Sequence, residues 1–156
     1  AARAIGIGPS IVEKAFFSYR GLPHRSQLVS EIDGIVFIND SKATNIDSAI
    51  KALLTFPNIR WICGGKQKEG DFSKINRALV NVKKAYVIGA DSQSYSNQIS
   101  CDYEICKTID VAVKSAFRDA KKGDTILLAP AAASFDQFSS FEERGETFES
   151  EVIKLM

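Results

Sequence analysis

The stretch that decides the fold is Ile35-Val36-Phe37-Ile38-Asn39-Asp40-Ser41-Lys42-Ala43-Thr44-Asn45. Its apolar run ends abruptly in polar groups, and a helical pattern begins at Ile46. This order predicts a strand, a polar turn and the start of a helix. In open α/β sheets ligands bind at such turns, because the amide groups and dipole of the helix point there. A plain connection needs only one capping residue, Ser41 or Thr44, so the additional polar groups favour ligand chemistry.

Short β-branched runs and amphipathic helical patterns alternate through the rest of the chain. The expected strands cover 35–39, 59–63, 85–89, 102–106 and 125–129. The expected helices follow Ile46, run over 72–82, 92–100 and 109–120, and end the chain with an apolar face from Phe141 to Leu155. Alternation of this kind predicts right-handed crossovers and a parallel sheet.

The first 34 residues depart from this alternation. An amphipathic helix is expected over 10–19, and a stiff joint follows because Pro23 fixes its own backbone dihedral. The runs 27–32 and 35–38 flank Asp33-Gly34, which is a hairpin turn signal. We therefore predict an α/β domain of three layers, Rossmann-like, with a mostly parallel sheet and an antiparallel edge strand from the N-terminal β-hairpin.

Composition excludes several classes of protein. The 156 residues suit one domain, and 45% apolar with 25% charged residues is ordinary for a soluble globular protein. A net charge of +1 gives no field that draws nucleic acid or an anionic membrane, and no apolar run approaches the ~20 residues of a spanning helix. The three cysteines lack metal-ligand spacing and His24 is the one histidine, which predicts reduced thiols, a cytoplasmic protein and no metal site. The absence of an initiator Met suggests a fragment of something longer.

Polar motifs follow four of the expected strands. They occupy 40–45, 64–71, 89–92 and 130–138. Because the carboxyl ends of parallel strands meet at one edge of a sheet, we expect these loops to form one site.

The four loops offer groups that suit an anionic ligand. The cations are Arg25, Lys42 and Lys68, and the hydroxyls beside expected helix starts are Thr44 and Ser134. Gly64 and Gly65 would let backbone amides approach a ligand closely. Asp40 is the exception and could take a ribose hydroxyl or a water on a magnesium ion. Lys66 is expected to be a solvated charge and Asp136 a cap.

Several motifs are absent from the sequence. It contains no G-x-x-x-x-G-K-[ST], no G-x-G-x-x-G after the first parallel strand and no G-x-S-x-G. The site is therefore expected to bind and orient a ligand, with the phosphate-activating apparatus elsewhere.

Five motifs in this order carry a family resemblance. They are Gly21-Leu22-Pro23-His24-Arg25, Asn39 to Asn45, Gly64-Gly65 with Lys68 and Asp71-Phe72, Ser134 to Phe138, and Phe141-Glu142-Glu143-Arg144-Gly145. Together they resemble the C-terminal domain of the Mur ligases, and Asp-Ser-Lys-Ala-Thr-Asn resembles the D-glutamate-adding members. The resemblance begins at Gly21, so we expect this domain to cover 21–156 and 1–20 to be the end of a central domain or a connecting helix. The departures are Gln67, Glu69 and Ala129.

The resemblance implies a role in peptidoglycan synthesis, and so in cell wall biogenesis, cell shape and division, in the bacterial cytoplasm. The family enzymes have an N-terminal domain for a UDP-sugar, a central P-loop ATPase that holds most of the ATP and Mg²⁺, and this domain. ATP phosphorylates the carboxylate of UDP-N-acetylmuramoyl-L-alanine, and the amine of D-glutamate displaces the phosphate. This chain alone is then expected to be inactive.

The resemblance also implies two sets of binding residues. The nucleotide-facing positions are His24, Arg25, Asp40 and Lys42, and the D-glutamate positions are Thr44, Lys68, Ser134, Phe135 and Phe141. Two alternatives remain: another ATP-dependent amide ligase, such as a folylpolyglutamate synthase-like enzyme, or a non-catalytic module that binds a nucleotide or an amino acid. The first would not be expected to carry Asp-Ser-Lys-Ala-Thr-Asn, and the second predicts tight binding without other domains.

Overall fold

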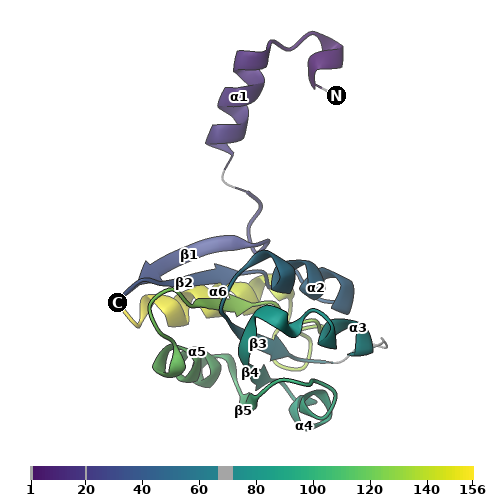
Figure 1. The fold of residues 1–156 in the computed structure, drawn as a ribbon, viewed down its shortest axis with the longest axis vertical. Coiled ribbons are helices and arrows are strands. Elements are labelled where there is room, and N and C mark those ends of the chain that lie inside the picture. The colour runs from purple at the N-terminus through teal and green to yellow at the C-terminus, as the bar shows by residue number, and fades with distance from the viewer. Residues whose placement is uncertain (1, 20, 67–71) are drawn as a thin grey trace.

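The computed structural model describes residues 2–19, 21–66 and 72–156, and it has a three-layer α/β architecture (Figure 1). Six strands form one sheet in the order β1-β2-β6-β3-β4-β5. The strands are β1 Gln27–Ile32, β2 Ile35–Asn39, β3 Ile59–Gly64, β4 Val82–Ile88, β5 Tyr103–Lys107 and β6 Thr125–Leu128. Each of the neighbouring pairs from β2 to β5 is parallel, and β1 pairs with β2 in the antiparallel sense. The predicted fold is confirmed.

The edge hairpin forms at the predicted turn. Asp33 and Gly34 both have positive φ angles, of 53° and 75°, and Ile32 pairs directly with Ile35. Positive φ at both central residues gives a two-residue turn whose twist matches that of the strands. The turn therefore fixes β1 as the antiparallel edge.

Helices cover both faces of the sheet. The helices are α1 Pro9–Ser18, α2 Ile46–Thr55, α3 Phe72–Asn76, α4 Ser92–Ser96, α5 Ile109–Asp119 and α6 Phe141–Ile153, with 3-10 turns η1 Ala2–Ile5 and η2 Leu79–Asn81. Along β3, Trp61 and Cys63 join the core under α2, α3 and α4, whereas Ile62 joins the core under α5 and α6. Burial on both faces explains why the parallel strands are continuously apolar rather than alternating.

Two predicted helices are shorter than their sequence patterns suggest. The 72–82 stripe divides into α3 and η2, because Ala78 takes ψ near 0° and its amide bonds to the Ile75 carbonyl three residues back. The strand β4 consequently begins at Val82 rather than at residue 85. The 92–100 segment forms only α4, which ends at Ser96.

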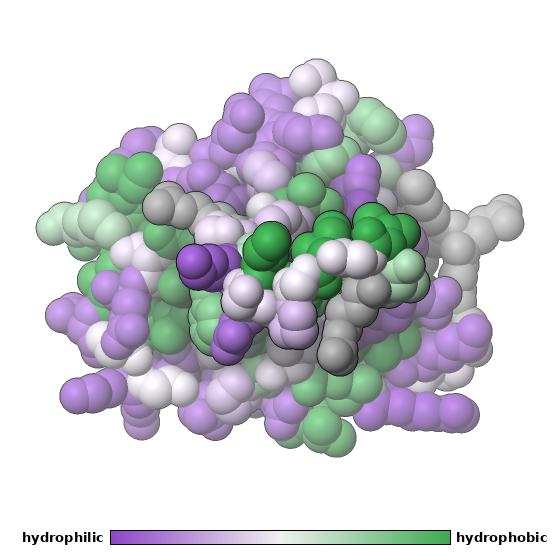
Figure 2. Space-filling view, turned by 90° about the horizontal axis from the view of Figure 1, so that it is seen from above, coloured by the Kyte–Doolittle hydropathy of each residue, from purple (hydrophilic) through white to green (hydrophobic). Residues whose placement is uncertain are grey.

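Helix α1 lies apart from the α/β body in Figure 1 and contains no buried residue. Its exposed side chains include several large apolar ones, and Figure 2 shows apolar side chains gathered on the N-terminal segment nearest the viewer. They line a shallow groove formed by Ile7, Ile11, Val12, Ala15, Phe16 and Tyr19. Across the described residues, we find no helix whose length and apolar character would let it cross a membrane.

Candidate functional site at the carboxyl edge of the sheet

The described parts of the four polar loops meet at one edge of the sheet, as predicted; residues 67–71 of the second loop lie outside the described residues. The loop after β6 is central and contacts each of the other three loops, because β6 lies between β2 and β3. The Ala131 amide donates to the Ala43 carbonyl at 2.8 Å, and Lys66 and Ala133 exchange backbone hydrogen bonds of 2.9 and 3.0 Å. The Ala90 amide donates to Asp136 Oδ2 at 2.8 Å, so Asp136 joins the loop after β6 to the loop after β4.

The glycines of this edge permit loops to approach one another. A Cβ on Gly64 would lie 2.2 Å from the Ile88 carbonyl oxygen, and one on Gly65 would lie 2.3 Å from that of Ala133. Both glycines also have positive φ, which side chains disfavour. In this structure the space beside these glycines is taken by the end of β4 and by the loop after β6.

The polar run Asp40 to Asn45 divides into inward and outward residues. Ser41 is fully buried: its hydroxyl donates to the Phe141 carbonyl at 2.7 Å and accepts from Arg144 Nε at 3.0 Å. Asn45 is the N-cap of α2, because its side-chain oxygen accepts from the Ser48 amide at 2.9 Å. The alternative in which Ser41 or Thr44 simply caps this helix therefore does not apply, since Ser41 is already engaged inside the domain and Asn45 directly precedes Ile46.

Asp40 lines a hollow of about 250 Å³ between residues 25–26, the loop after β2 and helix α2. The hollow is lined by Arg25, Ser26, Asp40, Lys42, Ala43, Ser48, Lys51, Ala52 and Thr55. Asp40 is 9% exposed, and its Oδ1 accepts from the Ser26 amide at 3.0 Å. Burial raises the pKa of Asp40, although the Ser26 hydrogen bond and the charge of Arg25 act in the opposite direction. No salt bridge joins Asp40 to Arg25 or Lys42 in the part of the chain that the structure describes.

A second hollow, of about 360 Å³, adjoins the first. Leu22, Pro23, His24, Arg25, Lys42, Phe141 and Glu142 line it. The Lys42 ammonium lies 3.7 Å from the centre of the Phe141 ring, which is a cation–π contact, and the His24 ring meets Phe141 edge-on at 6.3 Å. The structure thus brings together the four nucleotide-set residues and Phe141.

His24 is anchored by residues to which the sequence analysis assigned no role. Asn39 Nδ2 lies 2.9 Å from His24 Nδ1, 3.2 Å from the Gly145 carbonyl oxygen and 2.7 Å from Glu149 Oε1. A Cβ on Gly145 would lie 2.2 Å from His24 Nδ1, so this position in α6 requires glycine. Asn39 and Gly145 both belong to the quoted motifs, but only the fold shows that they face each other.

Arg144 is another motif residue to which the sequence analysis assigned no role. It is 1% exposed, and its guanidinium donates to Ser41 Oγ at 3.0 Å, to the Ser41 carbonyl at 2.9 Å and to the Ala132 carbonyl at 3.1 Å. Burial lowers its pKa to about 10, while the charge of Asp136 acts against that shift.

The D-glutamate set is less fully gathered. Ser134 is 2% exposed and Phe135 is 70% exposed, although they are adjacent. Thr44 is half-buried beside Ala43, whose carbonyl accepts from Ala131. Lys68 lies outside the described residues. The described chain contains no group of three His, Cys, Asp or Glu side chains that could hold a metal ion.

Comparison with known proteins identifies the family. The model of the family described as "Mur ligase, glutamate ligase domain" matches residues 24–132. The chain belongs to this family. It is 54% identical over 156 residues to the UDP-N-acetylmuramoylalanine–D-glutamate ligase of Ruegeria pomeroyi, covering 100% of the chain and 34% of that protein. The corresponding ligase of Roseobacter denitrificans is 51% identical, with 99% and 33% covered. The chain therefore spans about one third of the length of these relatives.

Solved structures share the fold of this Mur ligase domain. UDP-N-acetylmuramate-alanine ligase from Thermotoga maritima superposes with a TM-score of 0.68 at 12% identity, covering 99% of this chain and 36% of that one. The bifunctional folylpolyglutamate synthase/dihydrofolate synthase from Yersinia pestis gives 0.59 at 19% identity, with 85% and 32% covered. At these identities the likeness concerns the fold alone.

Proposed function

We propose that the chain is the amino-acid-binding domain of an ATP-dependent ligase that adds D-glutamate to UDP-N-acetylmuramoyl-L-alanine. The observation that carries the proposal is the set of charges at the carboxyl edge, where Arg25, Asp40 and Lys42 line adjoining hollows without ion pairs to one another. Relatives about 50% identical to the chain, which bear the name of this ligase, support the choice of substrate.

In the proposed reaction, ATP transfers its γ-phosphoryl group to the substrate carboxylate, which gives an acyl phosphate and ADP. The amine of D-glutamate then attacks the acyl carbon, the carbon–oxygen bond to phosphate breaks, and the amine loses a proton as the amide forms. This domain has no P-loop, so ATP and Mg²⁺ would be held mainly by a preceding domain. A single Asp40 among three cations suits a ribose hydroxyl better than a resident metal ion.

The contribution of this chain is positioning. His24, Arg25, Asp40 and Lys42 would face the nucleotide when the domains close. Thr44, Lys68, Ser134, Phe135 and Phe141 would hold D-glutamate, whose two carboxylates suit a cation and hydroxyls. Holding an amine against an acyl phosphate replaces a bimolecular encounter with an oriented one, which can lower a barrier substantially.

The complete ligase tests this function. Purified enzyme is expected to consume ATP in the presence of UDP-N-acetylmuramoyl-L-alanine and D-glutamate, and the 156-residue chain alone is expected to be inactive. Turnover with a pteroate substrate and L-glutamate instead would favour the folylpolyglutamate synthase alternative. Tight D-glutamate binding to the isolated chain, measured by calorimetry, would favour a sensor module.

Lys68 gives the sharpest test of the amino-acid site. Lys68→Ala in the complete enzyme should raise the KM for D-glutamate far more than that for ATP, because an unpaired, desolvated carboxylate costs about 2–5 kcal/mol. An unchanged D-glutamate response would remove the site from this loop.

A further inference from the structure

We propose that Arg144 is a positioning residue that fixes the 40–45 loop relative to the 130–138 loop, and so sets the nucleotide-facing residues relative to the D-glutamate residues. The inference rests on the proposed function for its kinetic consequence. Its structural part concerns three hydrogen bonds made by one guanidinium.

Arg144 is placed unusually for a structural cation. It is 1% exposed, and none of the salt bridges among the described residues includes it. Its three hydrogen bonds to described residues go to uncharged oxygens, two of them carbonyls. Burying a charge without a paired carboxylate is costly, and apolar residues often replace buried charges without loss of stability. Its role is therefore better explained by the geometry it imposes than by stability.

The guanidinium bridges the two loops directly. Nε and Nη2 hold the hydroxyl and carbonyl of Ser41, while Nη1 holds the carbonyl of Ala132. Because the five donors of a guanidinium lie in one rigid plane, bonds on both sides of it fix a distance and an orientation together. A lysine ammonium is a compact point charge and cannot reproduce that arrangement.

The residues flanking these contacts are those of the proposed site. Ser41 lies between Asp40 and Lys42, and Ala132 lies two residues before Ser134. The Ser41 hydroxyl also donates to the carbonyl of Phe141, and the Lys42 ammonium lies over the ring of the same Phe141. Movement of the Ser41 backbone would therefore shift both hollows relative to Ser134. Small displacements of this kind reduce the rate of an oriented attack strongly.

Kinetics of the complete ligase test the proposal. For Arg144→Lys we expect the KM for D-glutamate to rise at least tenfold and kcat to fall at least tenfold, while the KM for UDP-N-acetylmuramoyl-L-alanine changes less than twofold. Ser41→Ala removes one of the three bonds and should give a smaller change of the same kind. Glu146→Gln, on the exposed face of α6, is the matched control and should behave as wild type. A fall in kcat that matches the loss of folded enzyme, with all KM values unchanged, would overturn the proposal.

Hydrogen exchange in the 156-residue chain separates this inference from the proposed function. Arg144→Lys should speed exchange of the Ala131 amide, which bonds to Ala43 across the two loops, and leave the β3 amide of Ile62 protected. If wild-type enzyme does not ligate D-glutamate, the proposed function fails, and exchange still decides the structural role. Unchanged exchange at Ala131 in the Arg144→Lys variant would overturn the structural role of Arg144, even if the complete ligase is active.

Discussion

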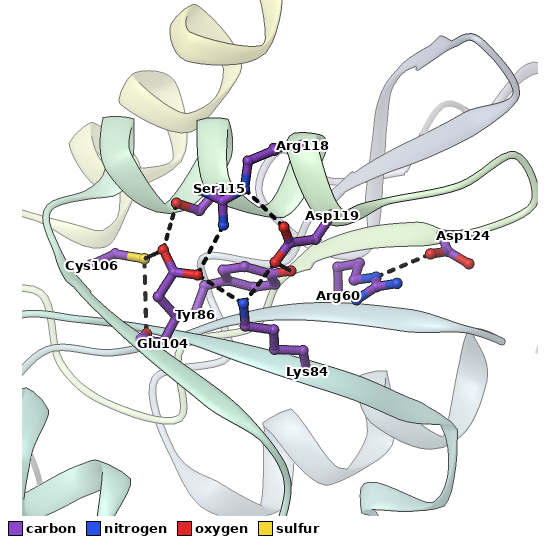
Figure 3. Close-up of polar contacts among 9 residues, drawn as sticks. All are labelled: Arg60, Lys84, Tyr86, Glu104, Cys106, Ser115, Arg118, Asp119 and Asp124. Atoms are coloured by element: carbon purple, nitrogen blue, oxygen red, sulfur yellow. Dashed lines mark hydrogen bonds and ion pairs between the residues drawn. The ribbon is translucent and has the colours of Figure 1, made fainter.

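The two edges of the sheet use charged residues in opposite ways. At the amino edge, shown in Figure 3, acids and bases pair with each other across strands β4 and β5 and helix α5. At the carboxyl edge, Arg25, Asp40 and Lys42 lie beside hollows and make no ion pair with one another. The difference separates charges that pair with each other inside the domain from charges that line hollows, which is where the proposed function places the ligands.

The amino edge contains two sets of paired charges. Lys84 Nζ contacts Glu104 Oε2 at 2.8 Å and Asp119 Oδ2 at 2.7 Å, and Tyr86 donates to the same Asp119 oxygen at 3.0 Å. Hydrogen bonds from Arg118, Lys84 and Tyr86 hold the pKa of Asp119 far below its usual range, although its partial burial acts against them. These contacts consume the hydrogen-bonding capacity of the charged groups, so they are structural.

The second set centres on Asp124, which directly precedes β6. It is 2% exposed and accepts from Arg60 Nε at 3.0 Å and from Lys83 Nζ at 2.6 Å. Burial would raise the pKa of Asp124, but these cations outweigh it and the pKa is lowered. Asp124 is thus a buried acid whose ionised form is fully compensated.

Replacing Asp124 should have the largest effect on stability. Asp124→Ala leaves Arg60 largely buried without its partner, so we expect the free energy of unfolding to fall by about 3 kcal/mol. Urea denaturation of the isolated chain measures it. Asp102→Ala, an exposed acid at the same edge, is the control and should change stability by less than about 0.5 kcal/mol. Equal losses in the two variants would contradict the division between the edges.

At the carboxyl edge, Lys42→Ala should affect catalysis more than stability. Loss of its contact with Phe141 should lower stability by less than about 1 kcal/mol. In the complete ligase, kcat/KM for ATP should also fall, because a charge proposed to face the phosphates is lost. The fall should correspond to a loss of roughly 2 kcal/mol of transition-state stabilisation. Paired measurements of unfolding and initial rate decide the matter. A large loss of stability with normal catalysis would show that Lys42 is structural.

Lowering the pH should change the stability contributed by Asp119 and by Asp40, one at each edge, in opposite directions. The pKa of Asp119 is lowered on folding, so its contribution is present above the unfolded value of about 4 and is lost as pH falls below it. The pKa of Asp40 is raised, so folding gains stability as pH falls through that raised value toward about 4.

Denaturation of the isolated chain from pH 7 to pH 2 tests the two signs. Asp119→Asn should flatten the loss of stability below about pH 4, whereas Asp40→Asn should remove a gain just above that pH. Identical pH profiles for both variants and wild type would refute the assignment.

The smallest effect is expected for Lys83. Its side chain is 41% exposed, and Asp124 keeps Arg60 when Lys83 is lost. Lys83→Met should therefore cost less than about 1 kcal/mol, because the Lys83 side chain is partly solvated and Arg60 continues to compensate Asp124. A loss as large as that of Asp124→Ala would mean that Lys83, rather than Arg60, compensates the buried acid.

The sequence by itself determined the alternation of strands and helices, the Asp33-Gly34 hairpin and the placement of four polar loops after parallel strands. These features depend on local periodicity and turn chemistry, which adjacent residues fix. Local patterns also overestimated two helices, because neither the apolar stripe at 72–82 nor the weaker, more polar pattern at 92–100 shows where a helix ends early.

Tertiary structure alone decided which residues of the polar run face inward. Ser41 and Asn39 are buried, whereas Lys42 lines both hollows. Arg144 contacts Ser41 from 103 residues away, and Gly145 is required by the His24 ring. Contacts between residues so distant in the chain depend on how strand order and helix packing place them, and a single sequence contains no local signal for that placement.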